Sequence, residues 1–132
     1  MVRSYPIDLG RSPEGDKRRR GDARTPVGRF HVVSRNRLSP FHRFLGLDYP
    51  GEVATDYGLK YGLISLGEAV SLRVARENGR PPDGSTALGG GIGIHGRRIG
   101  RDWTAGCIAM NDENVAELFN VLRIGDPVEI LP

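Results

Sequence analysis

The sequence predicts a single domain of mostly β structure, in the β-rich α+β class. Its 132 residues are enough for one hydrophobic core that needs no disulfide or metal for stability. The composition, with 19 glycines and 7% aromatic residues, is more typical of turns and strands than of a helical bundle. Segments with the alternating pattern of strands lie before and after one helical region, so strands are expected on both sides of a helical segment.

The first predicted strand runs from Arg3 to Leu9, where every second residue is apolar and would form one apolar face. Pro6 cannot donate a hydrogen bond to a ladder, so this strand is expected at a sheet edge. The polar segment 10–25 then forms a loop, and loops of that length are usually functional or disordered.

The second predicted strand covers residues 29–34 and places Phe30 and Val32 on one face. The segment 35–52 contains several prolines and glycines and is predicted to be irregular. Its packing anchors are expected to be Phe41, Phe44 and Leu47.

A helical hairpin is predicted over residues 53–79, approximately. Its first helix would be capped by Thr55 or Asp56 and would end near Gly62. The second helix starts with Ser65 and Glu68, which have the spacing of a capping box. It is expected to end at Asn78-Gly79.

The C-terminal region predicts a strand over residues 89–95, a helix and a closing strand. Asn111 or Asp112 would cap the helix, and Gly125 would occupy its C′ position. The helix carries apolar residues at i, i+3, i+4 and i+7, which are Val115, Leu118, Phe119 and Leu122. In the closing strand Val128 and Ile130 share a face.

The chain is basic, with a formal net charge of +3 and an isoelectric point near 9.4. Its most basic run, Lys17 to Arg20, is predicted to be a solvated surface loop. Nucleic acid is not an expected partner, because no aromatic stacking platform accompanies this run. An acidic polymer such as the cell wall is the other candidate partner. No apolar run is long enough to span a membrane, and no signal peptide is expected before the domain.

The chemistry is expected at the one cysteine, Cys107, and at His95. A thiol needs a base or a positive environment to become a nucleophilic thiolate. His95 ends a predicted strand, on the face opposite two core isoleucines, where an imidazole can face a cleft. Backbone N–H groups around Gly106 and Cys107 would stabilise the oxyanion of acyl transfer. Taken alone, this spacing favours a Cys–His pair no more than it favours two core residues. A zinc site is disfavoured, since Cys107 and the histidines lack a close ligand pair.

Two segments together resemble the catalytic motif of the L,D-transpeptidase catalytic domain, also called the YkuD domain. They are Ile94-His95-Gly96 and Thr104-Ala105-Gly106-Cys107-Ile108. Residues 4–10, 21–28, 46–50 and 88–96 also resemble blocks of that family, so the resemblance covers nearly the whole chain.

The resemblance implies a single catalytic domain over residues 1–132, with an L,D-transpeptidase-like β-sandwich or barrel fold. The hairpin at about 53–79 would be an insertion, and one helix would follow the catalytic cysteine. The strand that usually opens the family's domain is expected to be missing. No metal or organic cofactor is implied.

The implied activity is acyl transfer on peptidoglycan stem peptides in the cell envelope or periplasm. Cys107 would be the nucleophile, His95 its base, and the main-chain carbonyl of Gly96 would orient the ring. Gly106 would supply a backbone oxyanion donor. A donor stem would acylate the thiol and release its terminal D-amino acid, and an amine of a second stem would then take the acyl group. A carbapenem is expected to form a covalent adduct on Cys107.

Two positions depart from the family pattern: Ala105 stands where many members have His, and Ala109 where many have Arg. Substrate contacts are expected instead from five residues near the dyad, namely Trp103, Thr104, Arg97, Arg98 and Arg101. For the three arginines, a solvated basic loop is an equal alternative.

Two other functions stay open at this stage. If water resolves the thioester, the same dyad makes a peptidase or amidase. A non-catalytic wall-binding module is a more distant alternative.

Overall fold

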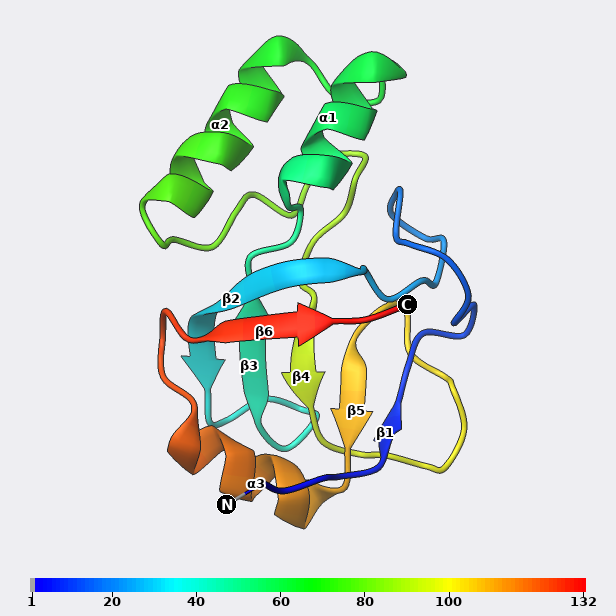
Figure 1. Cartoon of the computed structure of the whole chain (residues 1–132), viewed down its shortest axis with the longest axis vertical. Coiled ribbons are helices and arrows are strands. Elements are labelled where there is room, and N and C mark those ends of the chain that lie inside the picture. The colour runs from blue at the N-terminus through cyan, green and yellow to red at the C-terminus, as the bar shows by residue number, and fades with distance from the viewer. Residues whose placement is uncertain (1) are drawn as a thin grey trace.

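The computed structural model describes residues 2–132, which form six strands and three helices. In chain order these are β1 (Ile7–Asp8), β2 (Gly28–Asn36), β3 (Phe44–Leu47), α1 (Glu52–Lys60), α2 (Leu66–Glu77), β4 (Gly93–His95), β5 (Ile108–Met110), α3 (Asp112–Val121) and β6 (Pro127–Ile130). The strands form one curled sheet in the order β1-β5-β4-β3-β2-β6. In Figure 1, α3 lies at one end of this sheet and the α1–α2 hairpin at the other. The predicted mostly β, α+β class is confirmed.

The sheet is mixed, because β4 and β5 run parallel while the other neighbouring pairs are antiparallel. The parallel pair requires a crossover, and residues 96–107 supply it. This crossover carries most of the residues that the sequence assigned to the site.

Strand β1 lies at the sheet edge, as predicted, but its predicted faces are wrong. Ile7 is exposed and Asp8 is buried. The Asp8 carboxylate accepts hydrogen bonds from the backbone N–H groups of Ile99, at 2.7 Å, and Gly100, at 3.2 Å. A buried carboxylate needs such partners, so Asp8 points inward to hold the crossover rather than outward to water.

Segment 35–52 is not irregular throughout, and this part of the prediction is wrong. It contains β3, which lies between β4 and β2 near the middle of the sheet. Leu45 and Leu47 of β3 are buried. β5 also went unpredicted as a strand, and its three residues are all buried.

The helical hairpin is confirmed, with a correction at its start. α1 begins after Gly51, and Thr55 lies inside the helix, where its hydroxyl donates to the Gly51 carbonyl oxygen at 2.8 Å. The capping box of α2 is present as predicted, with Ser65 and Glu68 bonding reciprocally. A small core of Ile64, Ala69, Leu72 and Leu88 holds the hairpin to the loop that returns to β4.

α3 begins after Asn111, as predicted, and buries Val115 and Phe119 against the sheet. Its end differs from the prediction, because the backbone becomes extended at Leu122. Gly125 is therefore not the C′ residue; its N–H donates to the Val32 carbonyl oxygen at 2.8 Å in the turn before β6. Val128 and Ile130 lie in β6, which is the predicted closing strand. They pair with Phe30 and Gly28 of β2.

None of the helices within residues 2–132 combines the length and apolar character needed to cross a membrane.

Candidate active site

The parallel pairing of β4 with β5 brings the two predicted catalytic residues to one face of the sheet. In this register Ile94 lies beside Ile108, and His95 beside Ala109. Cys107 lies immediately before β5, and the alternation of side chains along a strand, continued through this residue, directs its thiol to the face of Ala109 and His95. His95 is not among the residues that line the pocket of the thiol. Figure 1 shows the two strands side by side.

Cys107 is partly buried and lies in a pocket of about 220 Å³. Its thiol donates a hydrogen bond to the Gly91 carbonyl oxygen, with the sulfur 3.3 Å from that oxygen. Burial raises the pKa of the thiol, while a backbone hydrogen bond from Gly93 and the charge of Lys17 act to lower it. Because burial is the largest effect, the thiol needs a base to ionise efficiently.

His95 is buried, and its ring orientation is fixed. Its Nδ1 atom lies 2.7 Å from the carbonyl oxygen of Gly96. A carbonyl can only accept, so Nδ1 carries the proton and Nε2 keeps the basic lone pair. Burial lowers the pKa of the imidazole, and the bond to Gly96 opposes this only partly. His95 is therefore a neutral base near pH 7.

Three aromatic rings surround the imidazole. Phe41 lies closest, with ring centroids 4.6 Å apart, and Phe44 stacks at 6.5 Å. Trp103 meets the imidazole edge-on at 5.9 Å. The three rings help to keep water from the imidazole. Trp103 therefore lies beside His95, and its predicted contact with a substrate stays a prediction.

In the part of the chain that the structure describes, no hydrogen bond joins the Cys107 thiol to the His95 imidazole. The thiol proton is directed at Gly91 instead.

Gly96 has no room for a side chain. A Cβ there would lie 2.5 Å from Oδ1 of Asp112 and 2.8 Å from the carbonyl oxygen of Phe41. The same Asp112 oxygen accepts the N–H of Arg97 at 2.8 Å, and the N–H of Gly96 donates to Phe41 at 2.8 Å. These contacts fix the carbonyl that orients His95.

The turn before Cys107 is held by Thr104. The buried Thr104 hydroxyl donates to the Cys107 carbonyl oxygen at 2.6 Å and accepts the N–H of Gly106 at 3.1 Å. Thr104 therefore positions this turn, and its predicted contact with a substrate stays a prediction. The N–H of Gly106 is engaged inside the turn, and its role as an oxyanion donor stays a prediction.

The three arginines of the crossover do not line the thiol pocket. Arg97 donates through Nε to the Pro40 carbonyl oxygen at 2.9 Å. Arg98 is ion-paired with Asp8 at 3.3 Å, and Arg101 is exposed. Arg97 and Arg98 are thus engaged elsewhere in the chain while Arg101 is not, and contacts of the three arginines to a substrate carboxylate stay a prediction.

Lys17 is the residue that the sequence prediction missed. Its predicted place in a solvated loop is wrong, because its side chain is only 3% exposed. Its Nζ atom pairs with Oδ1 of Asp22 at 2.9 Å, and it lines the same pocket as Cys107. The only signal in the sequence was the pair of aspartates, Asp16 and Asp22, on either side of the basic run.

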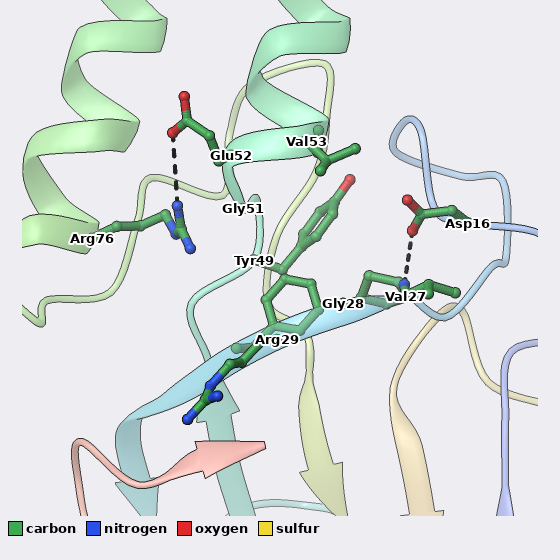
Figure 2. Close-up of a pocket in the computed structure, with 12 residues that line it drawn as sticks. Asp16, Val27, Gly28, Arg29, Tyr49, Gly51, Glu52, Val53 and Arg76 are labelled. Atoms are coloured by element: carbon green, nitrogen blue, oxygen red, sulfur yellow. Dashed lines mark hydrogen bonds and ion pairs between the residues drawn. The ribbon is translucent and has the colours of Figure 1, made fainter. Parts of the chain in front are cut away.

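A second hollow lies beneath α1 and contains no candidate nucleophile (Figure 2). Asp16 accepts the N–H of Val27 at 2.8 Å, and Arg76 is 3.9 Å from Glu52. Asp16 also pairs with Arg18 at 3.5 Å, so both carboxylates of this hollow have cationic partners, and the thiol pocket is the better candidate for chemistry. Within residues 2–132, no group of three or more His, Cys, Asp or Glu side chains is arranged to hold a metal ion.

Solved structures with a similar fold include several L,D-transpeptidases. One is L,D-transpeptidase 1 of Mycobacterium tuberculosis, with 17% sequence identity and a TM-score of 0.52. The match covers 99% of this chain and 50% of that one. The helical cell shape determining protein Pgp2 of Campylobacter jejuni shares 25% identity, with a TM-score of 0.56, covering 94% and 36%. Bd1075 of Bdellovibrio bacteriovorus shares 19% identity, with a TM-score of 0.57, covering 98% and 38%.

The chain thus spans half or less of the length of each of these three proteins. No curated protein matches it. The model of the family described as the L,D-transpeptidase catalytic domain, YkuD, matches residues 1–130. This chain therefore belongs to the L,D-transpeptidase catalytic domain family.

Proposed function

We propose that this protein is a cysteine acyltransferase that acts as an L,D-transpeptidase on peptidoglycan stem peptides at the cell envelope. The main support for the proposal is the β4–β5 register, in which His95 lies beside Ala109, two residues after Cys107, together with the lowered pKa of His95, which favours the neutral imidazole. Family membership supplies the substrate class.

In the first half-reaction His95 Nε2 takes the thiol proton, and the thiolate of Cys107 attacks the carbonyl carbon that joins the third residue of the stem to its terminal D-residue. The tetrahedral intermediate then collapses. The carbon–nitrogen bond breaks, and the imidazolium returns its proton to the leaving amine. The products are a thioester on Cys107 and a free D-amino acid.

In the second half-reaction an acceptor amine attacks the thioester. His95 accepts the proton that the amine loses, the new peptide bond forms, and the thiolate leaves. Return of that proton to the sulfur regenerates the thiol. A structure of L,D-transpeptidase 3 of Mycobacterium tuberculosis contains a faropenem-derived adduct, which supports the expectation that a β-lactam acylates Cys107 here.

Hydrolysis is the second candidate, because water can attack the same thioester. The two reactions differ only in the acceptor, so products distinguish them.

The test is incubation with disaccharide-tetrapeptide muropeptides, followed by mass spectrometry of the products and of the intact protein. A crosslinked dimer would identify a transpeptidase, and tripeptide product alone would identify a peptidase. Cys107→Ala should abolish either product. Absence of both products and of a thioester, in a protein that is folded by circular dichroism, would contradict the proposal and favour a wall-binding module.

A further inference from the structure

The pocket beside Cys107 contains two cationic side chains and, within residues 2–132, no carboxylate. Lys17 and Arg20 line it, together with backbone of several glycines and the turn that carries Cys107. Because those glycines present no side chains, the two cations and the thiol are its main chemical groups. A pocket of this kind favours an anion.

Lys17 is held in place rather than free in solvent. Its ammonium group donates to Oδ1 of Asp22, at 2.9 Å, and to the carbonyl oxygen of Arg19, at 3.1 Å. An ammonium group has three N–H donors, so one remains for a ligand. A Cβ on Gly106 would lie 3.7 Å from this nitrogen, which places the charge against the turn before the nucleophile.

Asp22 compensates the charge of Lys17, and the same carboxylate also binds several other donors of the loop. Besides Lys17 it accepts the backbone N–H groups of Arg18 and Arg24, at 2.8 and 3.1 Å, and of Arg19, at 3.1 Å. Asp22 therefore organises the whole loop, and Lys17 extends from that loop to the pocket.

Arg20 supplies the second cation. Its Nη2 atom donates to the carbonyl oxygens of Gly84 and Thr86, the latter at 3.1 Å. Within residues 2–132 its Nε and Nη1 atoms have no hydrogen-bond partner. One side of the guanidinium group is therefore anchored, and the other is available to an anionic ligand.

We propose that Lys17 and Arg20 form a subsite for the free carboxylate of the substrate's terminal residue, next to the bond that Cys107 attacks. This inference rests on the proposed function. A terminal carboxylate carbon lies one residue beyond the attacked carbonyl carbon, roughly 3.5 Å away in an extended chain. Lys17 and Arg20 line the same pocket as Cys107, so a carboxylate next to the attacked bond would enter the pocket that both cations share.

The subsite makes the enzyme selective for chain ends. A peptide that continues past the scissile bond presents a neutral amide at this position, and the two cations would then lose a charged partner. Hydrogen bonds to charged groups are the stronger kind, so the acid is expected to bind roughly ten- to a hundredfold more tightly than the corresponding amide.

The experiment measures binding without turnover, using the Cys107→Ala chain. Isothermal titration compares a synthetic tetrapeptide stem that has L-lysine as its third residue and a free terminal carboxylate with the same peptide as its terminal carboxamide. Only one group differs between the two ligands. A preference for the acid of at least about tenfold supports the subsite. Equal binding of the two peptides, or no binding of either at millimolar concentration, would overturn it.

The same titration in three further variants assigns the preference to these residues. Arg20→Gln removes one cation, and the double variant Lys17→Met with Asp22→Asn removes the buried pair together, which avoids an unpaired buried charge. Each should reduce the acid-to-amide ratio while leaving amide binding unchanged. Arg11→Gln is the matched control, since Arg11 is an exposed arginine of the same loop that does not line the pocket.

The two proposals fail in different ways. Loss of amide and acid binding together in Arg20→Gln, with an unchanged ratio, would indicate a purely structural role and reject the subsite. A clear acid preference with no turnover of muropeptides by the Cys107-containing chain would instead reject the proposed reaction and leave the carboxylate subsite standing.

Discussion

The Nδ1 atom of His95 lies 2.7 Å from the carbonyl oxygen of the next residue, Gly96. This bond sets the tautomer without any help from Cys107, so the base is prepared before the thiol turns toward it. A carbonyl in this place carries no charge, unlike the carboxylate of a Ser-His-Asp triad. The imidazolium is therefore less stabilised here, which is consistent with the lowered pKa of His95.

The first prediction tests the dyad through the reactivity of the thiol. His95→Ala should slow alkylation of Cys107 by iodoacetamide near pH 7, by roughly tenfold or more, because burial raises the pKa of the thiol. Wild-type labelling should also stay fast somewhat below pH 6.5, the ordinary value for histidine, because the pKa of His95 is lowered and the neutral base persists there.

The matched control for this measurement is His31→Ala. His31 pairs with Asp48 at 3.2 Å and does not line the thiol pocket, so its removal should leave the labelling rate unchanged. Circular dichroism of each variant checks the fold. A rate that is indifferent to His95 would mean that another group activates the thiol.

The second prediction concerns β-lactams. A carbapenem should acylate Cys107, since its strained amide is attacked by the same thiolate that the proposed reaction uses. Intact-protein mass spectrometry should show one added carbapenem mass on the wild type and none on Cys107→Ala. Equal adducts on both proteins would remove the support for Cys107 as the nucleophile.

The sequence predicted local elements well because their signals are local. The capping box of Ser65 and Glu68 forms as expected, and the spacing of Val115 and Phe119 correctly identifies the buried face of α3. Cys107 and His95 were predicted on motif and chemistry. The β4–β5 register puts His95 beside Ala109, two residues after Cys107, and the catalytic roles of the pair stay a prediction.

The errors arose where long-range contacts override local pattern. Asp8 points inward because the crossover, far along the chain, supplies its hydrogen-bond donors. Strands β3 and β5 have only four and three residues, too few for an alternating pattern to be distinguished from a loop. Lys17 looks like any basic surface residue until Asp22 and the pocket of Cys107 are seen around it.

The third prediction tests the packing that orients His95. Gly96→Ala should destabilise the protein by about 2 kcal/mol or more, because the added methyl meets Asp112 and the Phe41 carbonyl at 2.5 and 2.8 Å. It should also slow labelling of Cys107, since the Gly96 carbonyl would have to move.

Gly67→Ala is the control in the exposed first turn of α2, where only Ser65 lies within 4 Å, at 3.9 Å. That variant should be slightly stabilising, by about 0.5 kcal/mol. Urea unfolding measures both, and equal stability of Gly96→Ala and wild type would show that the site tolerates a side chain.

The last prediction concerns stability in acid and rests on Asp22. Burial acts to raise the pKa of this carboxyl, but hydrogen bonds from Arg18, Lys17 and their neighbours outweigh it, and the pKa is lowered. A carboxyl whose pKa is lower in the folded state binds fewer protons there than in the unfolded chain. Its contribution is therefore fully present above the ordinary range, about pH 4, and is lost as the pH falls through the folded-state value.

Asp22→Asn should accordingly be less stable than wild type at pH 7, and the difference in free energy of unfolding should shrink steadily below about pH 4. Urea unfolding at a series of pH values measures it. Glu129→Gln is the control, because Glu129 is exposed on β6, and its difference from wild type should stay small throughout. A difference for Asp22→Asn that does not change with pH would mean that the loop is held by the shape of its hydrogen bonds and not by the charge of Asp22. In that case the ammonium of Lys17 would be less well compensated than proposed, and its position beside Cys107 would depend on packing alone.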